Sequence, residues 1–162
     1  MGLETAHPQI LARLNKKFTL DHFSHAASYL RRHGIALRAF VLVKPPFLKE
    51  EEGIEWAVKS AAFALAHGAT VVSLIPTRPG NGALEKLMET GEFSPPQLSS
   101  LEKALELSLA LGAGGRILAD TWDLARFSSC PACLERRRQR LLAMNFSQQI
   151  LPAVDCQVCG GR

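Results

Sequence analysis

The stretch Ala36-Leu37-Arg38-Ala39-Phe40-Val41-Leu42-Val43 decides the fold class of this chain. Apolar side chains fill nearly every position of it, Arg38 being the interruption, and Pro45-Pro46 ends the run. A short apolar run bounded by turn residues is typical of a strand buried on both faces of a parallel sheet. Similar runs lie at Thr70 to Ile75 and at Arg116 to Thr121. We therefore expect three buried strands from these segments.

Segments with the period of an α-helix separate the strands. The predicted helices span Pro8 to Lys17, Thr19 to His33, Glu50 to His67, Ala83 to Thr90, and Pro96 to Leu111. Strands that alternate with helices of this length indicate βαβ units, whose strands run parallel. The fold class predicted from the residues is therefore α/β.

The composition is typical of a globular protein without a membrane-spanning segment. Of the 162 residues, 47% are hydrophobic and 21% are charged, which is the balance of a packed core with a polar surface. The longest apolar stretches are far too short to cross a bilayer. The N-terminal Met1-Gly2-Leu3-Glu4 lacks the basic and apolar regions of a secretory signal, so we expect a cytoplasmic protein. The formal net charge of +4 is only a weak indication of a nucleic-acid partner.

All four cysteines form two Cys-x-x-Cys pairs, Cys130 with Cys133 and Cys156 with Cys159. Each pair can place two thiolates on one tetrahedral metal ion, and zinc is the first candidate. An auxiliary iron–sulfur cluster is the alternative, because cysteine thiolates hold these clusters as well. Free buried thiols or two disulfides would be the remaining explanations, and a reducing compartment disfavours the disulfides.

A helix is predicted between the two cysteine pairs, from Leu134 to Gln149. Its apolar residues, expected to face inward, are Leu141, Leu142, Met144 and Phe146, and its arginines, expected to face outward, are Arg136, Arg137, Arg138 and Arg140. Outward arginines would form either a solvated helix face or a patch for the tRNA backbone. With the cysteines, this helix makes residues 123–162 a candidate tail domain. One functional hypothesis is a noncatalytic zinc-binding module that docks on RNA or protein.

Polar side chains follow the predicted strands at the edge where α/β proteins bind ligands. Lys44 and Arg78 could hold an anion there, and Asp120 and Asp123 could bind a substrate. The alternative for Lys44 is a solvated loop residue, and Asp123 would also serve as a helix N-cap. No catalytic residue is assigned by the sequence.

Three short motifs resemble the second half of a radical S-adenosylmethionine (SAM) enzyme. They are Gly2-Leu3-Glu4-Thr5, Leu14-Asn15-Lys16, and Leu74-Ile75-Pro76-Thr77-Arg78-Pro79-Gly80-Asn81-Gly82-Ala83-Leu84. The resemblance is to the branch that contains the elongator catalytic subunit and oxygen-independent coproporphyrinogen oxidase. It covers residues 1–122 and implies part of a parallel βα (TIM-like) barrel of about three to four strands.

The resemblance implies cofactor-binding roles for Glu4, Lys16, Arg38 and Arg78. Glu4 would bind the ribose of SAM, and Lys16 would bind its methionine carboxylate, because hydroxyls pair with a carboxylate and an ammonium pairs with a carboxylate. The acidic ribose ligand that the family often carries near Ala39 is missing here.

The chain also lacks the Cys-x-x-x-Cys-x-x-Cys loop that holds the [4Fe–4S] cluster in that family, since no cysteine precedes Cys130. The expectation is therefore a C-terminal fragment of a radical SAM protein, inactive alone. In its full-length form it would use SAM and a [4Fe–4S] cluster. Its expected partners are the missing N-terminal half of the barrel and tRNA, and its cysteine tail would carry zinc or an auxiliary cluster.

Overall fold

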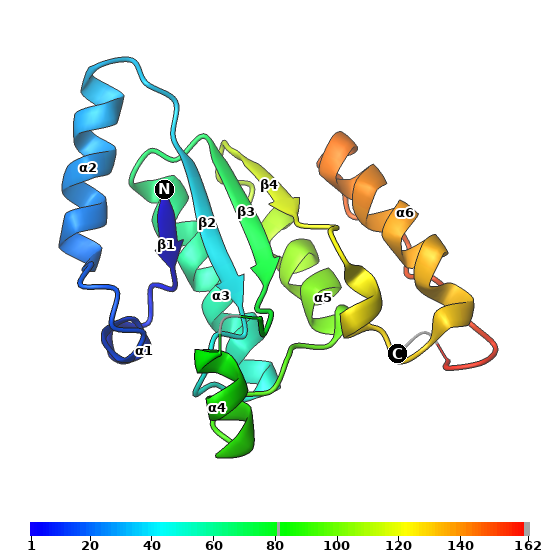
Figure 1. Cartoon of the computed structure of the whole chain (residues 1–162). Helices are drawn as coiled ribbons and strands as arrows, with labels where there is room; N and C mark the ends of the chain where they lie inside the picture. The colour runs from blue at the N-terminus through cyan, green and yellow to red at the C-terminus, as the bar shows by residue number, and fades with distance from the viewer. Residues whose placement is uncertain (81, 161–162) are drawn as a thin grey trace.

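A four-stranded parallel sheet forms the centre of the molecule in our computed structural model, which describes residues 1–80 and 82–160. The strands are β1 (Gly2–Glu4), β2 (Arg38–Val43), β3 (Val71–Pro76) and β4 (Arg116–Ala119), and they lie side by side in the order of the sequence (Figure 1). All three strand pairs are parallel. The prediction of an α/β fold with a parallel sheet is thus confirmed, whereas Asn81 of the third motif lies outside the described residues.

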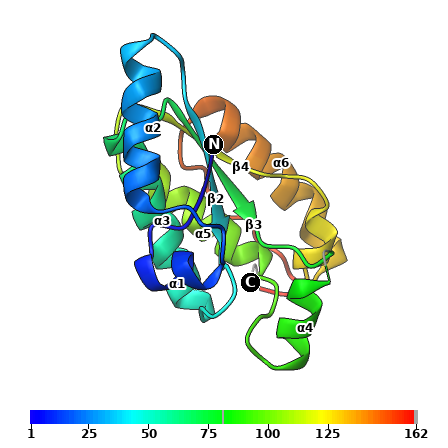
Figure 2. The same ribbon diagram turned by 60° about the vertical axis from the view of Figure 1, so that its left-hand side comes forward.

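The described part of the chain contains six α-helices and one short 3₁₀-helix besides the sheet. They are α1 (Pro8–Arg13), α2 (Leu20–Arg32), α3 (Glu50–Ala66), α4 (Ala83–Glu89), α5 (Leu98–Leu109), α6 (Pro131–Ser147) and η1 (Leu124–Phe127). Local chemistry explains where they begin: Thr19 caps α2 by accepting a hydrogen bond from the His22 N–H at 3.2 Å, and three glutamates fill the first turn of α3. In Figures 1 and 2, α2 lies beyond the β1 side of the sheet and α6 beyond the β4 side.

Helices α3 and α5 cover one face of the sheet and build the main core with it (Figure 1). Val41, Val72 and Leu74 are fully buried on this face. On α3, small residues at Ala57, Ala61 and Ala64 are also buried, which lets the helix approach the strands closely. Helices α3 and α5 therefore bury one face of the sheet.

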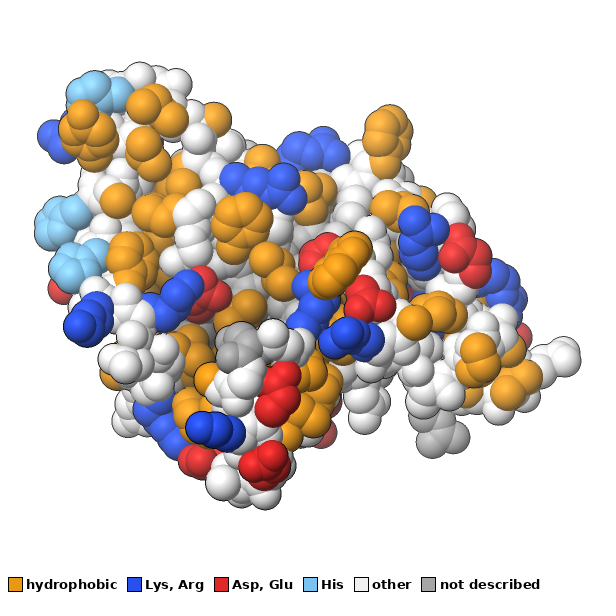
Figure 3. All heavy atoms as spheres, viewed as in Figure 1, with side chains coloured by type: hydrophobic (Ala, Val, Ile, Leu, Met, Phe, Trp, Pro, Cys, Tyr) orange, Lys and Arg blue, Asp and Glu red, His pale blue; other side chains and the backbone are white. Residues whose placement is uncertain are grey.

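The opposite face of the sheet is open. Along β2 burial alternates, so that Ala39 and Val41 are buried whereas Arg38 and Phe40 are exposed. Figure 3 looks onto this face, where hydrophobic and basic side chains lie next to one another over the strands. The expectation of strands buried on both faces was therefore wrong for β2, because no described helix covers its second side.

Helix α6 closes the outer edge of β4 with two side-chain amides. Asn145 accepts a hydrogen bond from the Ala119 N–H at 2.7 Å and donates one to the Ala119 carbonyl at 2.8 Å. Gln148 does the same for Ile117, at 2.7 Å and 2.9 Å. The two amides thus take the place of a neighbouring strand and satisfy backbone groups that an edge strand otherwise leaves unpaired. We call these four hydrogen bonds the amide clasp.

No helix among the described residues is long and apolar enough to cross a membrane.

Candidate functional site

The first cysteine pair is fixed by the start of α6. Cys130 immediately precedes the helix, Pro131 occupies its first turn, and Cys133 follows within that turn. Proline is well suited to this position because its missing N–H would have no partner there, and its fixed backbone angle suits the helix. The helix start therefore turns both thiols toward the same point.

The second cysteine pair returns to the first because the chain folds back along α6. Gln148 ends the helix with a left-handed backbone (φ 58°). Arg140 then donates hydrogen bonds to the carbonyls of Leu151 at 2.6 Å and Pro152 at 2.7 Å, and Arg136 donates one to the carbonyl of Asp155 at 2.9 Å. These bonds hold the returning segment against the helix that carries Cys130 and Cys133.

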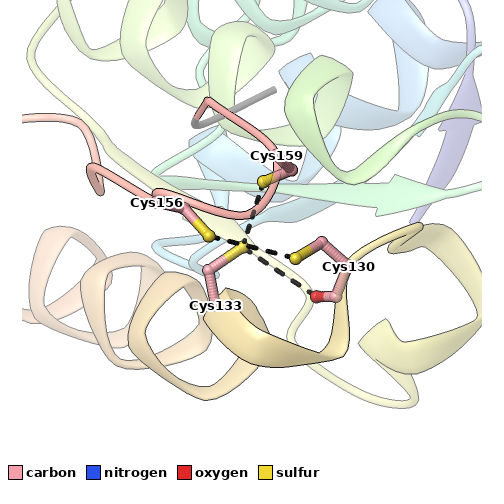
Figure 4. Close-up of side chains that lie close together, drawn as sticks. All are labelled: Cys130, Cys133, Cys156 and Cys159. Atoms are coloured by element: carbon pink, nitrogen blue, oxygen red, sulfur yellow. Dashed lines mark hydrogen bonds between the residues drawn. The ribbon is translucent and has the colours of Figure 1, made fainter.

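The four sulfur atoms form one compact cluster (Figure 4). All lie within 4.8 Å of one another, with 3.9 Å between Cys130 and Cys156 and 3.7 Å between Cys133 and Cys159. Four sulfurs bound to one tetrahedral zinc ion at about 2.3 Å stand about 3.8 Å apart. Three of the cysteines are buried, Cys159 is half-buried, and none is in a disulfide. The cluster can therefore hold one metal ion through four thiolates.

The protein environment shifts the pKa values of two of the four thiols in opposite directions. Backbone N–H groups of Cys159 and Val158 donate to the sulfur of Cys156 and lower the pKa of this thiol to about 6. Burial, followed by the neighbouring sulfurs, raises the pKa of Cys133 to about 12. Cys156 is thus prepared as a thiolate, whereas Cys133 must give up a proton when a metal ion binds.

A buried ion-pair network joins the cysteine cluster to the sheet domain. Arg137 on α6 donates to Glu102 of α5 at 2.5 Å and also interacts with Cys133. Arg140 pairs with Glu106 at 2.7 Å and with Glu102 at 3.6 Å. Both arginines are buried, so the expectation that they face outward was wrong.

The spacing of the acidic and basic residues in the sequence indicates this network. The periodicity of α6 alone does not. Glu102 and Glu106 are four residues apart and Arg137 and Arg140 are three apart, and either spacing places two side chains on one face of a helix. Phe146, expected to face inward, is 86% exposed instead. The helix therefore turns its two inner arginines toward α5 and its last aromatic residue toward solvent.

Glu4 and Lys16, the first two predicted cofactor residues, contact each other. Their side chains form an ion pair at the end of β1, where Glu4 has a left-handed backbone (φ 64°). Arg38 lies at the start of β2 on the open face and donates to the Ser73 hydroxyl at 2.8 Å. Each of the three thus has a partner within the chain.

Arg78 and Asp120 meet at the carboxyl ends of β3 and β4. The Arg78 guanidinium donates to the Asp120 carboxylate and to the Trp122 carbonyl, both at 2.7 Å. The guanidinium carbon of Arg78, Cζ, lies 4.9 Å from the centre of the Trp122 ring. Asp123 instead pairs with Arg126 at 2.6 Å and does not cap the following η1 through its side chain. Of the two predicted substrate residues, only Asp120 belongs to the cluster around Arg78.

Lys44, the other candidate anion ligand, is buried and engaged. Its ammonium pairs with Glu50 at 2.7 Å and donates to the Ser94 hydroxyl at 2.8 Å. Gly53 packs so closely on it that a Cβ there would stand 2.7 Å from the Lys44 Cβ. Burial opposes ionisation of Glu50, but hydrogen bonds from Lys44, Ser100 and the Gln97 N–H prevail and lower its pKa. Lys44 therefore ties β2 to α3 and the segment before α5.

Fold and site together define an α/β protein whose C-terminal segment carries a four-cysteine cluster able to hold a metal ion. The chain is 32% identical, over 67% of its length, to archaeosine synthase subunit beta of Methanosarcina acetivorans. It is 31% identical, over 74% of its length, to the protein of the same name from Thermococcus kodakarensis. An uncharacterized protein of Methanocaldococcus jannaschii is 25% identical over 75% of the chain.

The chain spans about a third of the length of these relatives: 32%, 37% and 34% of the three proteins, respectively. No protein-family model matches it.

These comparisons overturn the assignment to a radical SAM enzyme of the elongator and coproporphyrinogen oxidase branch. The named relatives are archaeosine synthase beta subunits, and no radical SAM family model matches the chain. The structure also offers a simpler account of the motif residues, since Glu4 pairs with Lys16 and Arg78 pairs with Asp120. SAM and a [4Fe–4S] cluster are accordingly not assigned to these side chains.

Proposed function

We propose that this chain is a zinc-carrying module of a tRNA-modifying assembly of the archaeosine synthase type, in which it docks on RNA or on a protein subunit. The cluster of four cysteine sulfurs within 4.8 Å is the observation that carries the proposal. The relatives named as subunits of archaeosine synthase supply the choice of assembly. In this role the metal ion is structural, because four protein thiolates fill a tetrahedral coordination shell and leave no position for a substrate.

Zinc suits the cluster better than an auxiliary iron–sulfur cluster. Two of the sulfur separations, 3.7 Å and 3.9 Å, match the edges of a tetrahedron around a single ion, and no sulfur pair exceeds 4.8 Å. An iron–sulfur cluster would hold the cysteines on different iron atoms and would therefore spread their sulfurs further apart. The compactness of the site thus favours one mononuclear ion.

The arrangement of the sheet supports a larger βα body around this module. Its strands are adjacent in sequence order, its helices α3 and α5 lie on one face, and its other face is open. A TIM-like barrel has this order and this single layer of outer helices. We propose that the four strands form part of such a barrel, left open at β4, where the amide clasp occupies the strand edge, and extended at β1 by a further protein segment or subunit, as the roughly threefold greater length of the relatives suggests. The division at residue 122 remains a prediction within this proposal.

Metal analysis of the purified chain tests the central claim. We expect one zinc ion per chain, no visible absorbance, and replacement by Co²⁺ with the absorption of a tetrahedral four-thiolate site. Bound iron with a broad absorption band at about 400 nm after anaerobic reconstitution would show that the cysteines hold an iron–sulfur cluster instead of zinc. A chain that is fully folded and binds neither metal would refute it.

The docking claim needs its own measurement. We expect the zinc-loaded chain to bind unmodified archaeal tRNA with an affinity that falls as salt rises, because phosphate contacts release counterions. Cys133→Ser protein provides the control for dependence on the folded tail. Failure to bind tRNA or any protein subunit of the assembly would leave a zinc protein without the proposed role.

A further inference from the structure

Two exposed aromatic residues mark the open face of the sheet. Phe40, in the middle of β2, is 37% exposed, and Trp122, just after β4, is 67% exposed. A hollow of about 430 Å³ lies over β2, β3 and β4; Phe40, Ile75 and Leu118 are among its apolar lining residues, and its polar lining includes Asp120 and Thr121, which precede Trp122 in the chain. Hollows of this size hold small organic ligands. This face therefore has the volume of a binding site and a lining of mixed apolar and polar side chains.

Trp122 is held in place although most of its surface is in solvent. Its backbone N–H donates to the Asp120 carboxylate at 3.1 Å, and its carbonyl accepts from Arg78 at 2.7 Å. The same guanidinium lies 4.9 Å from the indole ring and 5.5 Å from the ring of Phe127. An exposed tryptophan fixed by a cation and two hydrogen bonds loses little conformational entropy when a second planar group stacks on it.

Two arginines on this face, Arg38 and Arg116, are not neutralised by acidic side chains within the described part of the chain, whereas Asp120, which lines the hollow, is paired with Arg78. Arg38 lies 5.5 Å from the ring of Phe40, and Arg116 donates to the carbonyls of Asn145 and Phe146 at 2.9 Å and 3.0 Å. Neither arginine forms an ion pair with a carboxylate of the described residues. Aromatic rings interleaved with arginines are the means by which proteins bind unpaired bases and the phosphates that follow them.

We propose that the open face of the sheet binds a nucleotide whose base stacks on Trp122 and whose phosphate lies toward Arg38 and Arg116. The choice of RNA as the ligand rests on the proposed function. The addition is that the sheet makes the contact with the RNA. Helix α6 is less suitable for that contact. Two of its four arginines are buried, and Arg138 is paired with Glu135 at 3.2 Å. A purely hydrophobic protein partner would leave Arg38 and Arg116 without complementary charge.

The fluorescence of Trp122 can show whether a base is stacked on it. The chain has two tryptophans, so Trp56→Phe leaves Trp122 as the single emitter. We expect nucleoside monophosphates or short single-stranded RNA to quench its fluorescence in zinc-loaded protein, and ribose 5-phosphate, which has no base, to leave it unchanged. Quenching by free nucleotides identifies a small-molecule site, and quenching by RNA alone identifies a base within a chain. Equal quenching by ribose 5-phosphate would overturn the proposal.

Substitution of Trp122 separates this site from RNA binding elsewhere. Stacking of one base contributes about 1 to 3 kcal/mol, so Trp122→Ala should weaken RNA binding about tenfold (about 1.4 kcal/mol) in fluorescence anisotropy, while Trp122→Phe keeps a ring and loses less. Tyr29 is also an exposed aromatic, at 54%, but lies on α2, and Tyr29→Ala is the matched control. Unchanged affinity in Trp122→Ala protein would overturn the site.

The two proposals can fail separately. Zinc-loaded protein that binds tRNA equally well with and without Trp122 refutes the stacking site and leaves the proposed function intact. Protein that binds no RNA but forms a dimer or a complex with a subunit, lost in Trp122→Ala protein, overturns the nucleobase in favour of a protein interface. Loss of zinc binding would instead refute the metal module and would be seen by metal analysis of the same samples.

Discussion

The amide clasp on β4 gives the sharpest stability prediction of the structure. Asn145→Ala removes the acceptor for the Ala119 N–H and the donor to the Ala119 carbonyl. Each intramolecular hydrogen bond contributes about 0.5 to 1.5 kcal/mol net, so two of them amount to about 1 to 3 kcal/mol. For a domain of this size, about 2 kcal/mol corresponds to a fall in Tm of about 4 to 8 °C.

Urea unfolding of the zinc-loaded protein, followed by circular dichroism, measures this loss. Gln149→Ala is the matched control, because the Gln149 side chain is exposed and lies one residue beyond the clasp. Asn145→Asp is a second test, since it keeps an acceptor for the Ala119 N–H but points a negative charge at the Ala119 carbonyl. A loss below about 0.5 kcal/mol for Asn145→Ala, or a loss no larger than that of the control, would show that water replaces the clasp without cost.

Four further outcomes follow from the cluster and the ion pairs. Cys133→Ser should abolish tight zinc binding and lower Tm, which metal analysis and calorimetry check. Apparent zinc affinity should rise with pH from about 6 to about 8, because Cys133, with its pKa raised to about 12, must lose a proton on binding; competition with a chelator at several pH values measures this. Arg137→Met should cost about 3 kcal/mol by leaving the buried Glu102 with only the more distant Arg140, 3.6 Å away, and urea unfolding would show it. Stability should fall as acid protonates Glu50, whose pKa is lowered in the folded state, and Glu50→Gln protein should show a weaker acid dependence.

Clear contrary results exist for each of these outcomes. Zinc retained at full stoichiometry in Cys133→Ser protein would mean that three thiolates suffice. A zinc affinity independent of pH would mean that the thiols are already ionised in the metal-free protein. If Arg137→Met protein is as stable as the wild type, the buried pair is replaceable by apolar packing, and the further change Glu102→Leu should then have no additional effect. An unchanged acid dependence in Glu50→Gln protein would assign the acid transition to other carboxylates.

The positions of most elements could be predicted because local chemistry determines them. Thr19 does cap α2, and the acidic first turn of α3 begins where expected. The apolar run at 36–43 contains β2, and the run at 70–75 contains β3 except for its last residue, Pro76. What sits on each side of a strand depends on the packing of distant segments, and an apolar run is compatible with one covered face or with two. Phe40 shows this, since its residue type suggests a core and its face of the sheet is open.

The candidate site was predictable to a similar degree. Cys-x-x-Cys spacing places two thiols together because both lie within one turn, and two such pairs are most easily reconciled with one metal ion. The direction of Arg137 and Arg140 could not be read from α6 alone, because it depends on the glutamates that α5 presents. Pairing of Arg78 with Asp120 likewise depends on the register of β3 and β4, which sequence periodicity does not supply.

The interaction of Arg137 with both Glu102 and Cys133 links the packing of α5 to the state of the cysteines. When the metal is absent, Cys133 is protonated beside this guanidinium, and the segment that returns along α6 is held by the hydrogen bonds from Arg136 and Arg140 without the metal–thiolate bonds. Local opening of such a segment exposes backbone to proteases. We therefore expect the lifetime of this protein in the cell to follow the supply of the metal ion, so that metal starvation lowers its abundance.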